Sequence, residues 1–321
     1  GHTLKINWND TSGWLAPFKT VDGATIKNLR TEGEIKSSLN FLSGLVYEAY
    51  GNTTISGCVS AVNITSSYNE GGCAAAGMIE RVRDNAKVTI TDCVVKGKFT
   101  ATTEEGKRYM AGFVCNQYGT CTLTNCLYVG ENNGTGSNNH TFGYKTTLNN
   151  CYYLNACGKK QGEQISEAQL RNGYVAYMLQ GKRADMAWGQ KIGTDKEPLP
   201  TDEAAKHVYR VQFTHNGQAK AAAYANSGKT VSLPALSKFL GEGYNPHHYY
   251  ALAFGDGFSA STTITEDRQV AVTLDHKEYY EIKNKDDWKA FCDIVESGQT
   301  SVDAKLTQDV DLGSEIVMAG T

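Results

Sequence analysis

The sequence lacks the features that would link it to a membrane, a nucleic acid or a nucleotide. No apolar run in its 321 residues approaches the roughly 18 residues of a membrane helix, and no basic run resembles a nucleic-acid arm. The motifs HExxH, GxSxG, the P-loop and the Gly-rich dinucleotide turn are all absent. We therefore expect no membrane insertion within this chain, no nucleic-acid partner and no cofactor.

What the sequence does have is a short phrase repeated near its N-terminus. Each copy has an apolar residue or Cys at its first and fourth positions and Asn, Gly or Asp at its third. The copies are Ile26-Lys27-Asn28-Leu29, Ile55-Ser56-Gly57-Cys58, Ile90-Thr91-Asp92-Cys93, Leu123-Thr124-Asn125-Cys126 and Leu148-Asn149-Asn150-Cys151. Because Asn, Gly and Asp best tolerate a left-handed backbone, the third position is predicted to turn a corner between two strands.

A second phrase precedes each copy of the first. It reads Gly13-Trp14-Leu15, Gly44-Leu45-Val46, Gly77-Met78-Ile79, Gly112-Phe113-Val114 and, in degenerate form, Gly143-Tyr144. Both phrases recur at the same period, Val, Ile, Thr and Cys dominate this part of the chain, and no helical periodicity lies between the phrases. This combination indicates a stacked solenoid of strands. We expect an all-β dominated chain whose residues 1–160 form a right-handed parallel β-helix of about five coils.

The cysteines follow the same repeat. Cys58, Cys93, Cys126 and Cys151 occupy one slot of successive copies, which predicts a ladder of buried, reduced thiols. The spacings of the nine cysteines lack the C-x2-C knuckle of zinc sites, so no metal is expected. The odd count leaves at least one free thiol.

The paired phrases resemble the GLUG-type repeats of bacterial, Bacteroides-like cell-surface proteins over about residues 1–156. The resemblance implies display on the bacterial surface and an extracellular location. It brings no catalytic residues with it.

A helical period replaces the strand pattern over residues 163–181. Ser166 and Gln169 have the spacing of a capping box, Ile165 is placed as its staple, and Gly181 ends the helix. The predicted apolar face consists of Leu170, Tyr174, Tyr177 and Met178. We expect a single helix that plugs the open end of the β-helix.

The segment that follows, within residues 161–204, looks like the closing segment of such repeats in large gut-bacterial surface proteins. Trp188 and Asp195 are interpreted as part of this end-capping segment.

Residues 205–275 are expected to form a separate small β-unit. Strands are predicted over 208–213, 228–234 and 269–274, with a hairpin at Asn216-Gly217. The pattern is similar to the Listeria/Bacteroides repeat, a β-grasp-like module of surface proteins, which implies a spacer or adhesive role. His207, His215, His247 and His248 have no spacing that defines a metal geometry, and Tyr249-Tyr250 beside them indicates a packed surface.

Residues 276–321 change character again. Asn284 is placed to cap a helix that Gly298 ends, and a strand is predicted over 304–312. The apolar stripe of the helix is Trp288, Phe291, Cys292 and Val295. The segment resembles the N-terminal cap and first strand with which the same β-helix modules begin.

We expect a non-catalytic adhesion or ligand-binding fragment that recognises a host or environmental glycan or a surface protein. Polar loops project from the predicted corners, and Tyr68, Tyr109 and Tyr118 are the candidate ligand contacts. A passive stalk of a larger surface protein is the alternative. A polysaccharide-degrading enzyme is less favoured, because neither Asp92 nor Glu104-Glu105 belongs to a stack of carboxylates.

The ends of the chain suggest self-association. The strand predicted over residues 3–8 leaves an open edge that needs a cover. Residues 1–160 carry 15 Lys/Arg and 12 Asp/Glu, whereas residues 276–321 carry 5 and 10. We therefore expect residues 279–321 to dock on the N-terminal coil, in the same molecule or head-to-tail in the next.

Overall fold

The structure is a computed structural model that describes residues 2–11, 13–181, 183, 187–191, 194–201, 208–226, 228–266 and 268–314. Strands dominate these residues, which confirms the expected all-β class. The chain divides into two compact units, Gly1–Val208 and Tyr209–Thr321. No helix among the residues just given is long and apolar enough to cross a membrane.

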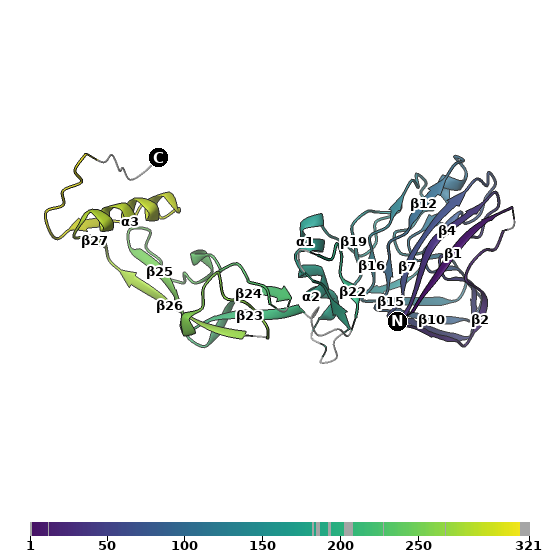
Figure 1. The fold of residues 1–321 in the computed structure, drawn as a ribbon, viewed down its shortest axis with the longest axis horizontal. Coiled ribbons are helices and arrows are strands. Elements are labelled where there is room, and N and C mark those ends of the chain that lie inside the picture. Colours follow the sequence, from purple (N-terminus) through teal and green to yellow (C-terminus); the bar gives the residue numbers. More distant parts are fainter. Residues whose placement is uncertain are drawn as a thin grey trace. The chain divides into compact units, whose positions relative to one another are not determined.

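Four parallel sheets make up most of the first unit (Figure 1). The nine-stranded sheet contains β1 (His2–Asp10), β4 (Leu29–Ser37), β7 (Val59–Ser66), β11 (Val94–Val95), β12 (Lys98–Ala101), β16 (Leu127–Tyr128), β17 (Glu131–Asn132), β19 (Tyr152–Tyr153) and β20 (Glu163–Gln164). The five-stranded sheet contains β3 (Thr25–Lys27), β6 (Asn52–Ser56), β10 (Lys87–Thr91), β15 (Thr120–Thr124) and β18 (Thr147–Asn149). The four-stranded sheet contains β2 (Phe18–Asp22), β5 (Val46–Tyr50), β9 (Ile79–Val82) and β14 (Val114–Gln117), and the two-stranded sheet β8 (Ala75–Ala76) and β13 (Met110–Ala111).

These sheets share one apolar core. Ile35, Ile55, Ile79 and Ala75, one from each sheet, are at most 1% exposed and belong to a single buried cluster. In each sheet the neighbouring strands come from successive repeats, as in the pairing of Ile90 with Ile55. One sequence repeat therefore corresponds to the step from one strand to its neighbour in the same sheet.

The predicted corner is confirmed in all five repeats. The residues Asn28, Gly57, Asp92, Asn125 and Asn150 have φ between 52° and 63°. Each follows a strand of the five-stranded sheet and directs the chain into the nine-stranded one. Gly57 also has a packing reason, since a Cβ there would lie 2.3 Å from Oδ1 of Asn28.

Asn125→Val should lower the free energy of unfolding by about 1–3 kcal/mol, because a β-branched residue is strained at φ 52°. The substitution also removes the bond that Nδ2 of Asn150 donates to Oδ1 of Asn125, 2.8 Å long. Asn125→Gly is the matched control, since it loses this bond without the strain. Equal melting temperatures for Asn125→Val and Asn125→Gly would show that backbone strain does not cause the loss of stability.

The Gly of the second phrase is explained by close approach of the backbone. A Cβ on Gly77 would lie 1.9 Å from the carbonyl oxygen of Gly112, and one on Gly112 would lie 2.0 Å from that of Thr141. Any side chain at these positions would push neighbouring repeats apart.

The predicted thiol ladder is also confirmed. Cys58, Cys93, Cys126 and Cys151 are buried and unpaired, and the backbone N–H of Cys58 donates to Sγ of Cys93 over 3.4 Å. Burial raises the pKa of the Cys93 and Cys126 thiols well above their usual range. The Cys93 and Cys126 sulfurs therefore pack as small protonated hydrophobes.

The single helix predicted over 163–181 is wrong, although its capping box at Ser166 and Gln169 is present. Two helices form, α1 (Glu167–Arg171) and α2 (Tyr174–Gln180), because Gly173 between them has φ 86°. Nor do they plug the end of the sheets. They pack on an outward-facing row of the nine-stranded sheet, Val59, Val94, Leu127 and Tyr152.

Trp188 completes this outer layer. It lies in β21 (Trp188–Gly189), which pairs antiparallel with β22 (Leu199–Pro200), and it is fully buried among the side chains of α1 and α2. Nε1 of Trp188 and Nη1 of Arg183 each donate to the corner carboxylate of Asp92 over 2.8 Å. Asp92, Arg183 and Trp188 thus hold the layer against the outer face of the nine-stranded sheet.

The second unit begins with a four-stranded mixed sheet in the order β24-β23-β26-β25. Its strands are β23 (Val208–His215), β24 (Gln218–Asn226), β25 (Tyr249–Phe254) and β26 (Arg268–Lys277), with 3-10 turns at Leu236–Lys238 and Gly255–Gly257. The hairpin is confirmed, with φ 51° at Asn216 and 76° at Gly217. The strand predicted over 228–234 is wrong, because only Lys229 makes a bridge there, to Ile264. Sequence reasoning missed β25, where Tyr249 and Tyr250 stand.

The C-terminal part contains β27 (Tyr280–Ile282), α3 (Lys285–Glu296) and β28 (Ala304–Leu306). The predicted cap is confirmed, since the N–H of Asp287 donates to Oδ1 of Asn284 over 2.9 Å. Of the predicted stripe, Phe291, Cys292 and Val295 are buried and Trp288 is half-buried; Trp288, Phe291 and Val295 pack with Ile282 of β27 and with Tyr249. The strand predicted over 304–312 ends at Leu306, which is 57% exposed.

Candidate functional site

The three tyrosines predicted as ligand contacts lie in two places. Tyr68 and Tyr109 occupy corresponding loops, between β7 and β8 and between β12 and β13, and both are half-buried. The hydroxyl of Tyr68 donates to Oε2 of Glu70 over 3.0 Å. Tyr118 lies in the turn between β14 and β15 and is 61% exposed. No single site contains all three.

Sequence reasoning missed a cluster on the four-stranded sheet, which we call the Arg81 face. Its members are Phe41, Tyr47, Glu48, Tyr50, Glu80, Arg81, Arg83 and Asn116. The sheet register aligns Glu48, Arg81 and Asn116 on β5, β9 and β14. These three residues each stand four positions after a repeat glycine, Gly44, Gly77 or Gly112. That shared slot was the signal available in the sequence.

Arg81 stands at the centre of this face. Its Cζ lies 5.0 Å from the ring centroid of Phe41 and 5.6 Å from that of Tyr47. Nη1 of Arg81 donates to Oη of Tyr47 and to Oε1 of Glu48, each over 3.3 Å. Cation–π contacts and a charge-assisted hydrogen bond therefore fix the guanidinium in one orientation.

A second guanidinium extends the face toward solvent. Nη1 of Arg83 lies 3.5 Å from Oε1 of Glu48, and its Cζ lies 5.6 Å from the ring of Tyr50. The Tyr50 hydroxyl donates to Oε2 of Glu48 over 3.3 Å. The Arg83 side chain is 38% exposed, so it presents both charge and hydrogen-bond donors at the surface.

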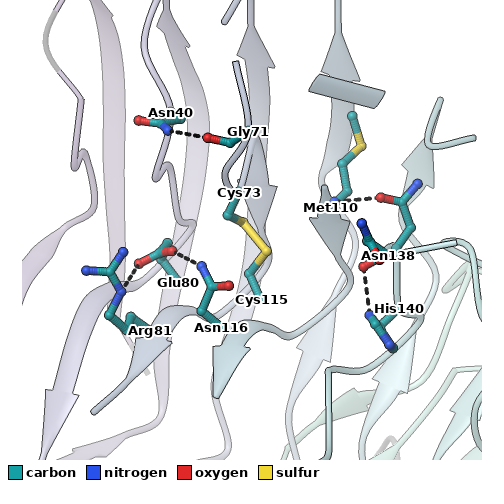
Figure 2. The surroundings of a disulfide bond; sticks show 11 residues. Asn40, Gly71, Cys73, Glu80, Arg81, Met110, Cys115, Asn116, Asn138 and His140 are labelled. Atoms are coloured by element: carbon teal, nitrogen blue, oxygen red, sulfur yellow. Dashed lines mark hydrogen bonds and ion pairs between the residues drawn. A yellow bond between two sulfur atoms is a disulfide. The ribbon is translucent and has the colours of Figure 1, made fainter. Parts of the chain in front are cut away.

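A buried carboxyl group underlies Arg81. Figure 2 shows Glu80 between Arg81 and Asn116, beside the Cys73–Cys115 disulfide. Glu80 is fully buried, Asn116 donates to its Oε1, and Nε of Arg81 lies 3.5 Å from its Oε2. Burial raises the pKa of Glu80 to about 7, against the opposing effects of the Arg81 charge and the Asn116 hydrogen bond.

Glu48 and Glu80 are a carboxylate pair on neighbouring strands, which the sequence analysis did not find. A buried carboxyl with a raised pKa beside a second carboxyl is an arrangement that acid–base hydrolysis uses. Glu80, however, has no exposed surface and cannot reach a substrate oxygen. The geometry therefore favours a contact surface over a catalytic pair.

The Cys73–Cys115 disulfide braces this region. Its Cα atoms are 6.2 Å apart and its sequence separation is 42 residues. Closing a loop of that length in the unfolded chain corresponds to about 4 kcal/mol in the chain-entropy model. Cysteine spacing alone could not identify the pair, because sequence does not define connectivity.

The structure separates the histidines considered for a metal. Nδ1 of His215 contacts the carbonyl oxygen of Val272 at 2.8 Å, while His248 meets His276, with 2.7 Å between Nδ1 and Nε2. His207 lies outside the described residues. Within the described part of the chain, no group of three or more His, Cys, Asp or Glu residues could hold a metal ion.

No family model, curated protein or solved structure matches this chain.

Proposed function

We propose that this chain is a non-catalytic, ligand-binding or adhesive part of a bacterial cell-surface protein, with a host or environmental glycan or a surface protein as its ligand. The observation that carries the proposal is the Arg81 face, which displays Arg83 and Tyr50; the exposed Tyr118 lies next to it, since its backbone N–H donates to the carbonyl oxygen of Val82 over 2.9 Å. Arg and Tyr are the residues that most often dominate binding surfaces. Tyr68 and Tyr109 remain candidate contacts in their own loops.

The architecture we propose to support this surface is a right-handed parallel β-helix of about five coils, with the four parallel sheets as its faces. The GLUG-type resemblance of residues 1–156 and the five left-handed corners support it. For residues 205–275 we propose a β-grasp-like surface repeat, and for residues 276–321 the opening of a further module.

An extracellular location is part of the proposal. Disulfides persist mainly in oxidising compartments, and Cys73 and Cys115 form one. The resemblance to surface repeats agrees with this location.

The proposal is tested by screening the chain against a glycan array and a panel of host surface proteins. Tyr118→Ala and Arg83→Ala should each weaken the detected binding by about tenfold or more. Tyr244→Ala is the matched control, because Tyr244 is 47% exposed in the second unit. Equal binding by the parent, Arg83→Ala and Tyr118→Ala would exclude the Arg81 face and the neighbouring Tyr118 from the function.

The same screen separates the alternatives. A passive stalk would bind nothing in either panel. An enzyme would shorten the polysaccharides offered to it, and no exposed carboxylate pair on the Arg81 face supports that outcome.

Head-to-tail association through residues 279–321 remains a proposal, in a narrower form. The Trp288 and Phe291 side chains already pack within their own unit, so within the described residues 279–314 the exposed Leu306 in β28 is the large apolar side chain left for such a contact. Sizing of the chain with and without residues 279–321 tests it. Unchanged elution over a wide concentration range would exclude association.

A further inference from the structure

A second site of the first unit is an open cavity where β1 ends and β2 begins. It has a volume of about 610 Å³ and is lined by Asn7, Trp8, Asn9, Asp10, Gly13, Trp14, Leu15, Ala16 and Lys19. Small-molecule sites occupy about 300–1,000 Å³, so the space suits a ligand of one or two sugar rings. The cavity contains none of the tyrosines predicted as ligand contacts.

Trp14 is the unusual residue of this cavity. Its side chain is 54% exposed, although removing an indole ring from water into a protein core is strongly favourable. Its backbone is held at φ 61°, which is rare for a bulky residue. The ring lies 6.4 Å from that of Tyr47, so a neighbouring aromatic supports it. The result is a supported, solvent-facing aromatic platform.

The polar lining is suited to hydroxyl groups. The lining includes the polar residues Asn7, Asn9, Asp10 and Lys19, which offer hydrogen-bond donors and acceptors. A purely apolar ligand would displace water from these groups without replacing its hydrogen bonds, which is costly. Because Asp10 and Lys19 have opposite charges, the lining does not select strongly for a charged ligand.

We propose that this cavity binds a neutral saccharide of one or two rings, with the C–H face of a pyranose stacked on Trp14 and its hydroxyls bonded to Asn9, Asp10 and Lys19. The inference rests on the proposed binding function and names a ligand class and a place for it. It is distinct from the Arg81 face, although the Trp14 ring lies beside that of Tyr47.

The test uses the whole chain and neutral mono- to tetrasaccharides of glucose, galactose, mannose and N-acetylglucosamine. Saturation-transfer NMR detects weak binding, and calorimetry gives the affinity. Trp14→Ala should weaken binding by about tenfold or more, while Trp14→Phe keeps an aromatic face and should lose less. Asp10→Ala should weaken binding by about fivefold, since one set of hydrogen bonds is lost.

Two controls separate this proposal from the proposed function. Tyr244→Ala, in the second unit, should leave saccharide binding unchanged, and thermal melts establish that each variant is folded. If a saccharide binds equally to the parent and to Trp14→Ala, the cavity assignment is overturned while the binding function stands. If only ligands of the Arg81 face bind, or if no neutral saccharide binds, the cavity assignment is overturned as well.

Discussion

Replacing Cys93 by Asp should lower the free energy of unfolding by about 3–5 kcal/mol, enough to unfold a domain of ordinary stability. Cys93 is fully buried, and its Sγ lies 3.2 Å from the carbonyl oxygen of Thr91 and 3.8 Å from that of Ile55. A carboxylate in this place would face these two acceptors as well as the Cys58 N–H that donates to the sulfur. It would have to be protonated or expel the strand.

Urea denaturation measures this effect, and two variants calibrate it. Cys93→Ser keeps the donor and should cost only about 1–2 kcal/mol. Thr91→Asp places the same carboxylate two residues earlier, at a half-exposed position, and should cost about 1 kcal/mol or less. If Cys93→Asp were no less stable than Thr91→Asp, the thiol ladder would not be interior.

The features that could be predicted from sequence are those that recur in every repeat. The five corner residues were identifiable because a left-handed backbone admits few residue types, and the same choice is made five times. The slot shared by Cys58 and Cys93 was readable for the same reason. In both cases the backbone or the packing allows few residue types at one position of the repeat, so those types recur from copy to copy.

Features that occur once were missed or misjudged. The break at Gly173 looked like the interior of one helix, because the apolar period continues across it. The place where α1 and α2 pack depends on Val59 and Leu127, which are far away in sequence. The bond between Cys73 and Cys115 and the burial of Glu80 likewise depend on which repeats become neighbours. Such long-range contacts leave no local pattern.

Glu80 gives the second large expectation, a stability that falls as pH rises. Burial raises its pKa in the folded chain to about 7, from an ordinary value of 4.5. Between these pH values the folded state binds more protons than the unfolded state, so the free energy of unfolding decreases with pH. At about 1.4 kcal/mol per pKa unit, the total loss is roughly 3 kcal/mol, complete above the folded pKa.

Glu80→Gln should remove this loss, because an amide of the same shape keeps an acceptor for Asn116 and carries no proton to lose. Urea midpoints at pH 5, 6, 7 and 8 should therefore fall for the parent and change much less for the variant. Glu131→Gln is the control, since Glu131 is 69% exposed and its removal should leave the parent slope intact. Parallel slopes for the parent and Glu80→Gln would contradict a buried carboxyl as the cause. If the pH dependence of stability flattens only in Glu80→Gln, Glu80 is neutral below about pH 7 in the parent. Glu48 is then the carboxylate that mainly balances the charge of Arg81 in that range.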